Sequence, residues 1–311
     1  MSSMAAPLCE ADGDAENAGY AFMLDEWSHL YLGDYDATFR LKHQVLRKME
    51  EAFNLRWYHW AYAAASWANV CIGRWGEAIE DAEEELRIAE KFSDQSLISF
   101  ANWNFCIAYT AKGDIARAMD YGERAVAKAP TPADRAYALG PLAWAWCRHG
   151  EPDRAIPKLA EIVGVIREAG WRPSENFSLY LGEAYLVAGE LDKAQESLRT
   201  TLELAEECGM RFFVGSCHRL LGEVALRGAS DRLVAAREHF ERSIATLSEI
   251  NAENELAAAY AGYGEALGRS SRITDARDYF TRAVDIFERL GTLLEPERIR
   301  TRLAALPAGD S

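Results

Sequence analysis

The sequence lacks the features that define several large classes of protein. No apolar run approaches the roughly eighteen uncharged residues of a membrane-spanning helix, and the first residues have neither the basic lead nor the apolar stretch of a secretory signal. Basic residues are the minority, with 34 Lys and Arg against 49 Asp and Glu, a formal net charge of −15. Binding to a nucleic-acid backbone requires a dominant basic face. We therefore expect a chain that binds neither a membrane nor nucleic acid.

Cysteine is scarce, and none of the six cysteines belongs to a CxxC pair. In a chain of 311 residues without an export signal, such cysteines are typical of reduced thiols in the cytoplasm. The motifs of common catalytic and metal sites are missing as well, because the sequence has no GxxxxGK[ST] loop, no GxSxG elbow and no HxxxH pair. These absences predict a cytoplasmic protein that is not an enzyme and has no catalytic residues, metal or cofactor.

What the sequence does contain is an internal repeat of about 40 residues. A small anchor residue recurs at intervals of 40, 40, 37, 39, 42 and 40 residues, and an aliphatic residue follows each anchor by eight positions. A glycine stands five positions before each of the first five anchors. Each unit therefore fits a helical hairpin, in which the glycine closes the first helix and the small anchor lets the two helices cross closely. The anchors are Thr38, Ala78, Ala118, Ala155, Ala194, Ala236 and Ala276, and the glycines are Gly33, Gly73, Gly113, Gly150 and Gly189.

The repeat predicts an all-α fold, because the sequence shows neither alternating β-branched runs nor Asn-Gly hairpins. A single helical hairpin cannot bury its apolar face alone, so the neighbouring units must stack into a solenoid. Repeats that start near residues 19, 59, 99, 136, 175, 215 and 257 fill the stretch 19–294. We expect residues 1–18 to form a flexible acidic tail, and 295–311 to form a capping helix and tail with Pro296 in its first turn.

These residues resemble the tetratricopeptide repeat (TPR) family. The resemblance covers about residues 19–294 and implies a right-handed α-solenoid of seven helical hairpins plus a C-terminal capping helix. The period exceeds the family's usual 34 residues by about six, which implies longer helices. Long-period arrays of this kind resemble the repeat regions of bacterial cyclase- and ATPase-linked signalling regulators. The agreement is best at Leu181, Gly182, Glu183, Ala184, Tyr185, Gly189, Ala194 and Leu198, and at Tyr109, Gly113, Ala118, Ala125 and Pro130.

The resemblance also implies that the first helices line a concave side, which binds partners. Positions eleven and eighteen residues before the anchors change character along the array. In the first four units they are aromatic or apolar, and this ladder comprises Tyr20, Trp27, Trp60, Trp67, Phe100, Ile107, Tyr137 and Trp144, with Trp103 one turn from Phe100. Charged residues follow in the later units, namely Glu183, Glu223 and Glu265, with Arg219 nearby. Large exposed aromatic surface tends to mark a binding site, but the rings could equally pack between the first helices of adjacent units.

A dense run of carboxylates lies in the second helix of unit two, from Glu77 to Glu85. General acid–base pairs need two carboxylates held apart in a cleft, whereas these follow one another around a helix start, where the helix dipole favours negative charge. We expect a solvated helix face here, or alternatively a docking patch for a basic partner.

Two functions fit the sequence. The first is a non-catalytic scaffold that binds a protein or peptide segment in its concave groove, with aromatic anchors in one half and Glu and Arg in the other. The alternative is a regulatory, ligand-sensing or self-association module of a larger bacterial signalling protein, linked to a cyclase or an ATPase. No motif indicates the identity of the partner or the oligomeric state.

Overall fold

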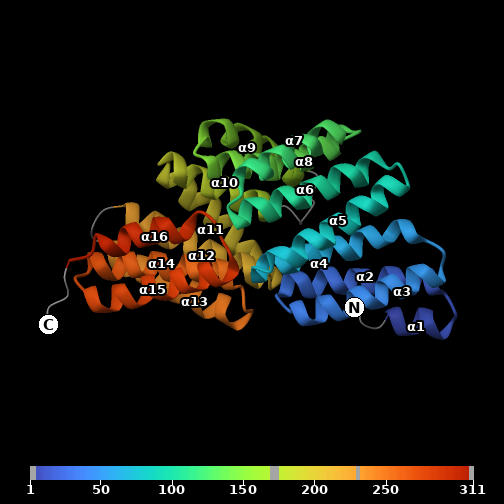
Figure 1. The fold of residues 1–311 in the computed structure, drawn as a ribbon, viewed down its shortest axis with the longest axis horizontal. Coiled ribbons are helices and arrows are strands. Elements are labelled where there is room, and N and C mark those ends of the chain that lie inside the picture. Colours follow the sequence, from blue (N-terminus) through green and yellow to red (C-terminus); the bar gives the residue numbers. More distant parts are fainter. Residues whose placement is uncertain (1–4, 169–174, 229–231, 308–311) are drawn as a thin grey trace.

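The computed structural model describes residues 5–168, 175–228 and 232–307, and within these ranges the chain is helical and has no strand. Figure 1 shows the helices in chain order, from α1 at the N-terminus to α16 near the C-terminus. The helices are α1 (Ala5–Ala11), α2 (Ala15–Leu32), α3 (Tyr35–Glu51), the 3-10 helix η2 (Leu55–Trp57), α4 (Tyr58–Ile72), α5 (Trp75–Lys91), α6 (Gln95–Lys112), α7 (Ile115–Lys128), α8 (Pro132–His149), α9 (Pro152–Glu168), α10 (Glu175–Ala188), α11 (Leu191–Cys208), α12 (Arg211–Arg227), α13 (Leu233–Glu249), α14 (Glu253–Arg269), α15 (Ile273–Leu290) and α16 (Glu295–Ala304).

Helices α2 to α15 form seven helical hairpins that stack side by side, and α16 packs on α15 as a cap. In each hairpin an even-numbered first helix pairs with the odd-numbered helix that follows it. The first helices begin at residues 15, 58, 95, 132, 175, 211 and 253, at or up to four residues before the predicted repeat starts. The predicted α-solenoid of seven hairpins with a C-terminal capping helix is thus the observed fold.

The repeated small residues explain how each hairpin closes. All seven anchors, from Thr38 to Ala276, are 0% exposed, because they lie where the two helices of a hairpin cross. The five repeated glycines end the first helices with φ between 78° and 93°, in the left-handed region that glycine adopts without a Cβ clash. In unit seven Ser271 follows the first helix with a similar φ of 61°. The sequence pattern therefore records a close helix crossing in all seven units and a left-handed turn in the first five.

The N-terminal segment differs from its prediction. Residues 1–18 were expected to be a flexible tail, but α1 is helical and α2 begins at Ala15. Asp14 caps α2, where its side chain accepts a hydrogen bond from Asn17 N at 3.1 Å, and Glu10 forms an ion pair with Lys48 of α3 at 3.0 Å. The acidic residues of this segment thus serve as a helix cap and as an ion-pair partner. Residues 1–4 and 308–311, the ends of the two expected tails, lie outside the described residues.

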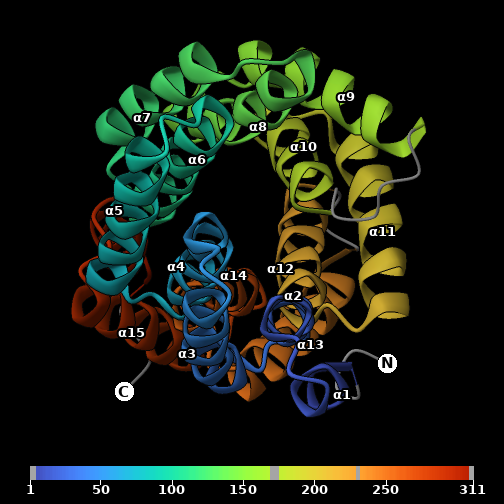
Figure 2. The ribbon, with the colours of Figure 1, turned by 90° about the vertical axis from the view of Figure 1, so that its right-hand side faces the viewer.

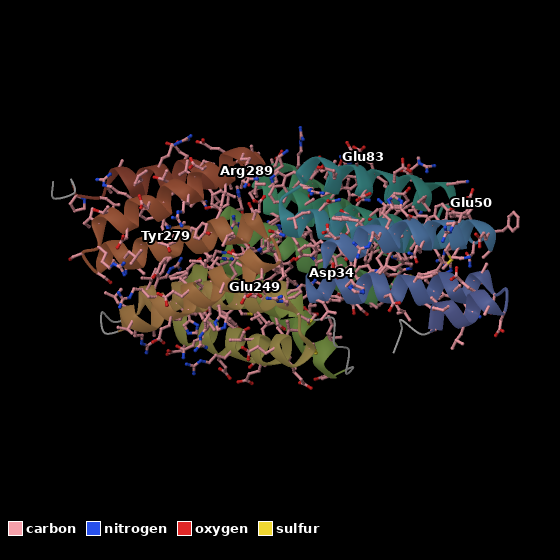
Figure 3. The ribbon with its side chains drawn as sticks, turned by 90° about the horizontal axis from the view of Figure 1, so that it is seen from below. Asp34, Glu50, Glu83, Glu249, Tyr279 and Arg289 are labelled. Carbon is pink, nitrogen blue, oxygen red and sulfur yellow. The ribbon has the colours of Figure 1, made fainter. Side chains whose placement is uncertain are left out.

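The stacked hairpins curve round a common axis (Figure 2), and the last units pack beside the first ones along that axis (Figure 1). Helix α2 contacts α12 and α4 contacts α14, and Leu293 N donates a hydrogen bond to Lys112 O at 2.9 Å. A Cβ added to Gly73 would lie 2.7 Å from Leu290. We call this contact between the first three and the last two units the seam. Figure 3 shows it from below, with Asp34 on one side and Glu249 on the other. The seam encloses the first helices, so they line an inner channel.

Candidate functional site

A cavity of about 530 Å³ lies on the inner face of the first four units and the start of unit five, and we call it the aromatic chamber. Its volume falls within the range of small-ligand pockets, and aromatic rings dominate its wall. Six members of the predicted ladder line it, together with three rings that the sequence register missed, those of Tyr31, Trp57 and Phe177. The full lining is Met23, Trp27, Tyr31, Trp57, Trp60, Trp67, Ser96, Ser99, Phe100, Trp103, Asp134, Tyr137, Ala138, Asn176 and Phe177.

The rings of the aromatic chamber hold one another in place. Trp27 lies edge-to-face against both Trp60 and Trp67, with centroids 6.1 Å apart in each pair. Trp60 in turn meets Phe100 at 5.1 Å. Trp60 and Trp67 are two turns apart on α4, which places both on one face of that helix. Because edge-to-face contacts fix ring orientation, these half-buried tryptophans form a preformed apolar wall.

Some ladder residues pack between units instead of lining this chamber. Ile107 is only 3% exposed and belongs to the hydrophobic core around units two to five. Tyr20 lies edge-on against Trp57 at 4.8 Å, and Trp144 stacks on Tyr180 at 4.5 Å with an interplanar angle of 6°. Trp103, which lines the chamber, is itself 7% exposed. Part of the ladder therefore lines the chamber, and part of it packs between neighbouring units.

A second cavity, of about 300 Å³, lies on the inner face of units five to seven, and we call it the arginine chamber. The four charged residues that the sequence predicted, Glu183, Arg219, Glu223 and Glu265, all line it. Further charges come from distant parts of the chain, including the capping helix α16. The remaining lining residues are Arg148, Leu186, Val187, Leu226, Arg227, Asn254, Glu255, Ala258, Ala261, Gly262, Arg269, Phe287, Glu295, Arg298, Ile299 and Arg302.

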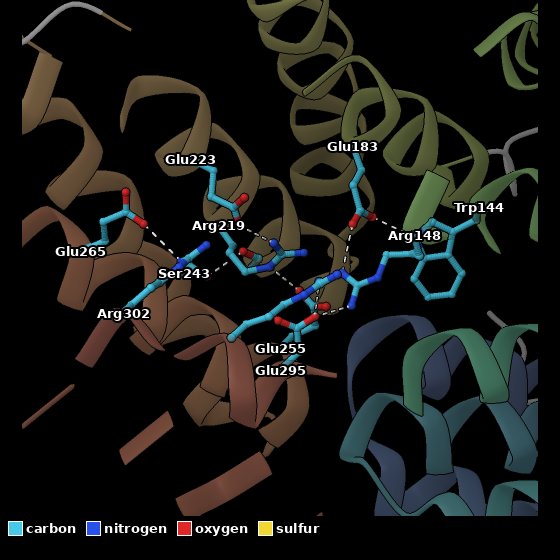
Figure 4. Close-up of polar contacts among 12 residues, drawn as sticks. Trp144, Arg148, Glu183, Arg219, Glu223, Ser243, Glu255, Glu265, Glu295 and Arg302 are labelled. Atoms are coloured by element: carbon cyan, nitrogen blue, oxygen red, sulfur yellow. Dashed lines mark hydrogen bonds and ion pairs between the residues drawn. The ribbon is translucent and has the colours of Figure 1, made fainter. Parts of the chain in front are cut away.

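Arg219 and Glu183 are the most buried charges of the arginine chamber, each 7% exposed, and Figure 4 shows Arg219 among the surrounding glutamates. Its Nε donates to Glu255 Oε2 and its Nη1 to Glu223 Oε1, both at 2.7 Å. Burial opposes the charge on Arg219, but Glu255 and Glu223 more than offset this and raise its pKa above the usual value. Arg219 is therefore a permanent cation held by two carboxylates.

Trp144 links the two chambers. Its Nε1 donates to Glu183 Oε2 at 2.8 Å, and Arg148 Nη1 donates to the other oxygen of the same carboxylate at 3.3 Å (Figure 4). Arg148 Nη2 reaches across to Glu295 Oε1 of the capping helix at 2.7 Å. A small cavity of about 50 Å³ between the chambers shares Trp67 with the aromatic chamber and Glu183 with the arginine chamber. The two chambers thus lie along the same inner face, which we call the channel, with this small cavity between them.

The wall behind the aromatic chamber contains buried ionisable groups. His59 and Glu85 are both 0% exposed, with His59 Nδ1 3.2 Å from Glu85 Oε1. Burial lowers the pKa of His59 to about 3 and raises the pKa of Glu85 well above its usual value, although Asn104 Nδ2 opposes the second shift by donating to Glu85 at 2.7 Å. The carboxylate run is therefore not a uniformly solvated face, because Glu85, and Asp81 with 9% exposed, point inward. A neutral His59 leaves the aromatic wall without a positive charge.

The described residues offer no site for a metal, since no group of three or more His, Cys, Asp and Glu side chains among them is placed to hold one. No helix within the described ranges is both long and apolar enough to cross a membrane. Cys9, Cys71, Cys106, Cys147 and Cys217 form no disulfide, and the last four of these are buried.

The fold and the channel define a TPR-like α-solenoid, and several solved structures share this fold. A Rap protein complexed with competence and sporulation factor aligns with a TM-score of 0.64 and 11% identity, over 92% of this chain and 80% of that one. NprR in complex with its cognate peptide NprX aligns with a TM-score of 0.60 and 14% identity, over 91% and 81%. A chain of the Cut9–Hcn1 hetero-tetramer of APC/C aligns with a TM-score of 0.67 and 15% identity, over 94% and 49%.

These likenesses concern the fold, and this chain spans about half of the matched Cut9–Hcn1 chain. No protein-family model and no curated protein matches the sequence. The TPR-like fold predicted from the repeat is confirmed by the solved structures. The resemblance to cyclase- and ATPase-linked regulators stays a prediction.

Proposed function

We propose that this protein is a non-catalytic scaffold that holds a protein or peptide segment in its inner channel. The observation that carries the proposal is the aromatic chamber, a cavity of about 530 Å³ walled by half-buried tryptophans. A monomer rarely keeps so much aromatic surface partly hydrated unless a partner covers it. The solved complex of NprR with its cognate peptide, which has the same fold, supports the same conclusion.

The chemistry of the channel suits a flexible segment. Tryptophan and tyrosine rings contribute large contact area at low entropic cost and are frequent hot spots of protein interfaces. The charged residues of the arginine chamber would then fix the orientation of the bound segment. The four buried free thiols support a reducing compartment such as the cytoplasm as the place where binding occurs.

The experiment that tests the proposal is affinity capture of a random peptide library on the immobilised full chain. Wild type should enrich defined sequences, and Trp60→Ala should weaken the enriched peptides about tenfold or more, because it truncates a ring of the chamber wall. Phe92→Ala is the control, because Phe92 lies at the C-terminal end of α5, the second helix of unit two, and is 42% exposed. Circular dichroism would verify that both variants fold. A folded Trp60→Ala variant that captures the same peptides with unchanged affinity would contradict the proposal.

A further inference from the structure

We propose that the channel binds a peptide in one direction, with the amino-terminal end in the aromatic chamber and the carboxylate end in the arginine chamber. This inference rests on the proposed function and adds the direction of the ligand. It is carried by the difference in charge between the two chambers, which matches the charge difference between the two ends of a peptide.

The aromatic chamber favours a positive group. Asp134 is the single acidic or basic side chain among the described residues that line it. Its Oδ2 accepts hydrogen bonds from Thr131 Oγ1 at 2.6 Å and from Ser96 Oγ at 3.3 Å, which fixes the carboxylate at the chamber wall. The faces of tryptophan rings attract cations such as an ammonium group. A carboxylate entering this chamber would meet a like charge and no cation.

The arginine chamber favours a negative group. Its described lining contains six arginines and five glutamates, an excess of one positive charge in a chain whose formal net charge is −15. Each of the five glutamates already pairs with an arginine: Glu183 and Glu295 with Arg148, Glu223 and Glu255 with Arg219, and Glu265 with Arg269. An incoming ammonium would have to displace one of these arginines, whereas an incoming carboxylate needs only unused donors.

Arg227 supplies such donors. It is exposed within the chamber, and its Nη1 donates to the backbone carbonyl of Leu186, while no carboxylate of the described residues forms an ion pair with it. The planar guanidinium keeps further N–H groups in the geometry that binds a carboxylate through two hydrogen bonds. Arg148 adds a second unused donor, because its buried Nε has no hydrogen-bond partner. Each of these two arginines therefore has an N–H donor without an acceptor, and the carboxylate of a peptide would provide one.

The test uses the peptide enriched by wild type, synthesised in four forms: with free ends, with an acetylated amino end, with an amidated carboxyl end, and with both ends blocked. Either block should weaken binding to wild type, by about tenfold for the carboxyl end, as expected for a charge-assisted hydrogen bond. Arg227→Gln should weaken the free-carboxylate forms by a similar factor and leave the amidated forms unchanged. Asp134→Asn should weaken only the forms with a free amino end.

Two matched controls carry the same chemical changes on outer helices. Arg199→Gln on α11 removes an exposed arginine, and Asp153→Asn removes an acidic residue from the first turn of α9, as Asp134→Asn does in α8. Neither residue lines a chamber, so neither substitution should alter the affinity of any form.

The outcomes separate the direction from the function. The proposed direction is wrong if Arg227→Gln weakens only the forms with a free amino end, or if the affinity loss in both variants is the same for free and blocked ends. In that case the proposed function still stands, provided that capture depends on Trp60. If wild type captures no peptide from the library, both proposals fail. Selective coupling of Arg227 to the carboxyl end and of Asp134 to the amino end supports the direction.

Discussion

The two halves of the channel occupy equivalent positions of the same repeat but have opposite chemistry. Eleven residues before the anchor, unit two carries Trp67 and unit five carries Glu183. The anchors Ala78 and Ala194 of the same units are both 0% exposed. The hairpins are thus held together by the anchors and their apolar partners, while the inner positions of the first helices are free to differ. This separation lets one solenoid present an apolar surface at one end and a charged surface at the other.

The halves also depend on different forces. The aromatic half buries ring surface, so removing a ring leaves a space that neighbours or water can fill. The arginine half buries charge, so removing one partner leaves an uncompensated charge in a poorly hydrated site. Substitutions of equal size should therefore cost more stability in the arginine half.

The largest expected effect comes from Arg219→Met in the arginine half. This change keeps an unbranched side chain but removes the guanidinium, which leaves Glu223 and Glu255 without their shared cation, and breaking such a buried pair costs about 3–5 kcal/mol. Arg269→Met is the matched comparison, because Arg269 also pairs with a glutamate one turn away but is 48% exposed, and it should cost about 1 kcal/mol or less. Urea denaturation of both variants measures the free energy of unfolding. Similar losses for the two arginines would show that burial does not distinguish them.

A smaller difference is expected within the aromatic half, between Trp103→Ala and Trp60→Ala. Trp103 is 7% exposed and contacts Phe100 with ring centroids 4.2 Å apart, so its truncation should cost about 3–5 kcal/mol. Trp60 is half-buried at the chamber wall, and its truncation should cost about 2 kcal/mol less. Thermal or urea unfolding compares the two. If Trp60→Ala destabilises as much as Trp103→Ala, the wall of the aromatic chamber is hydrophobic core and not a binding surface.

The fold was predictable because its determinants are local and periodic. A glycine with φ between 78° and 93° and a small residue at the helix crossing, Thr38 in unit one and alanine in the units that follow, recur in the first five units, so their spacing alone indicates the hairpins. Trp27 and Trp67 could be assigned to the inner face for the same reason. Tyr31 was missed although it lies one turn after Trp27, which is the signal that would have placed it on that face.

The rest of the site could not be predicted, because it depends on how far each unit rotates against the next. The pair of Arg148 with Glu295 joins residues 147 positions apart, from unit four to the capping helix, and no local pattern reports that contact. Trp57 reaches the aromatic chamber from a 3-10 turn before α4, outside the register of the repeat. The burial of Glu85 likewise follows from the helices packed over it and not from its neighbours in the sequence.

The smallest expected effect tests whether the first and last units are in contact across the seam. Gly73 and Gly189 end equivalent helices with φ of 78° and 80°, so an alanine at either position suffers the same backbone strain, about 1 kcal/mol. A Cβ at Gly189 would meet nothing within 4 Å, whereas a Cβ at Gly73 would lie 2.7 Å from Leu290 across the seam. Gly73→Ala should therefore cost about 1–2 kcal/mol more than Gly189→Ala in urea denaturation, and small-angle scattering should show a larger radius of gyration for Gly73→Ala alone.

Equal losses for the two glycine variants, with unchanged scattering, would mean that the seam is open in solution. The aromatic and arginine surfaces would then lie along an open groove, and a ligand could bind one of them without meeting the other. A larger loss for Gly73→Ala would instead show that the contact across the seam holds the channel in shape. In that case Gly73→Ala should also weaken a captured peptide, although Gly73 lines neither chamber, because Leu290 ends α15 and the next helix, α16, carries Glu295 and Arg302 of the arginine chamber.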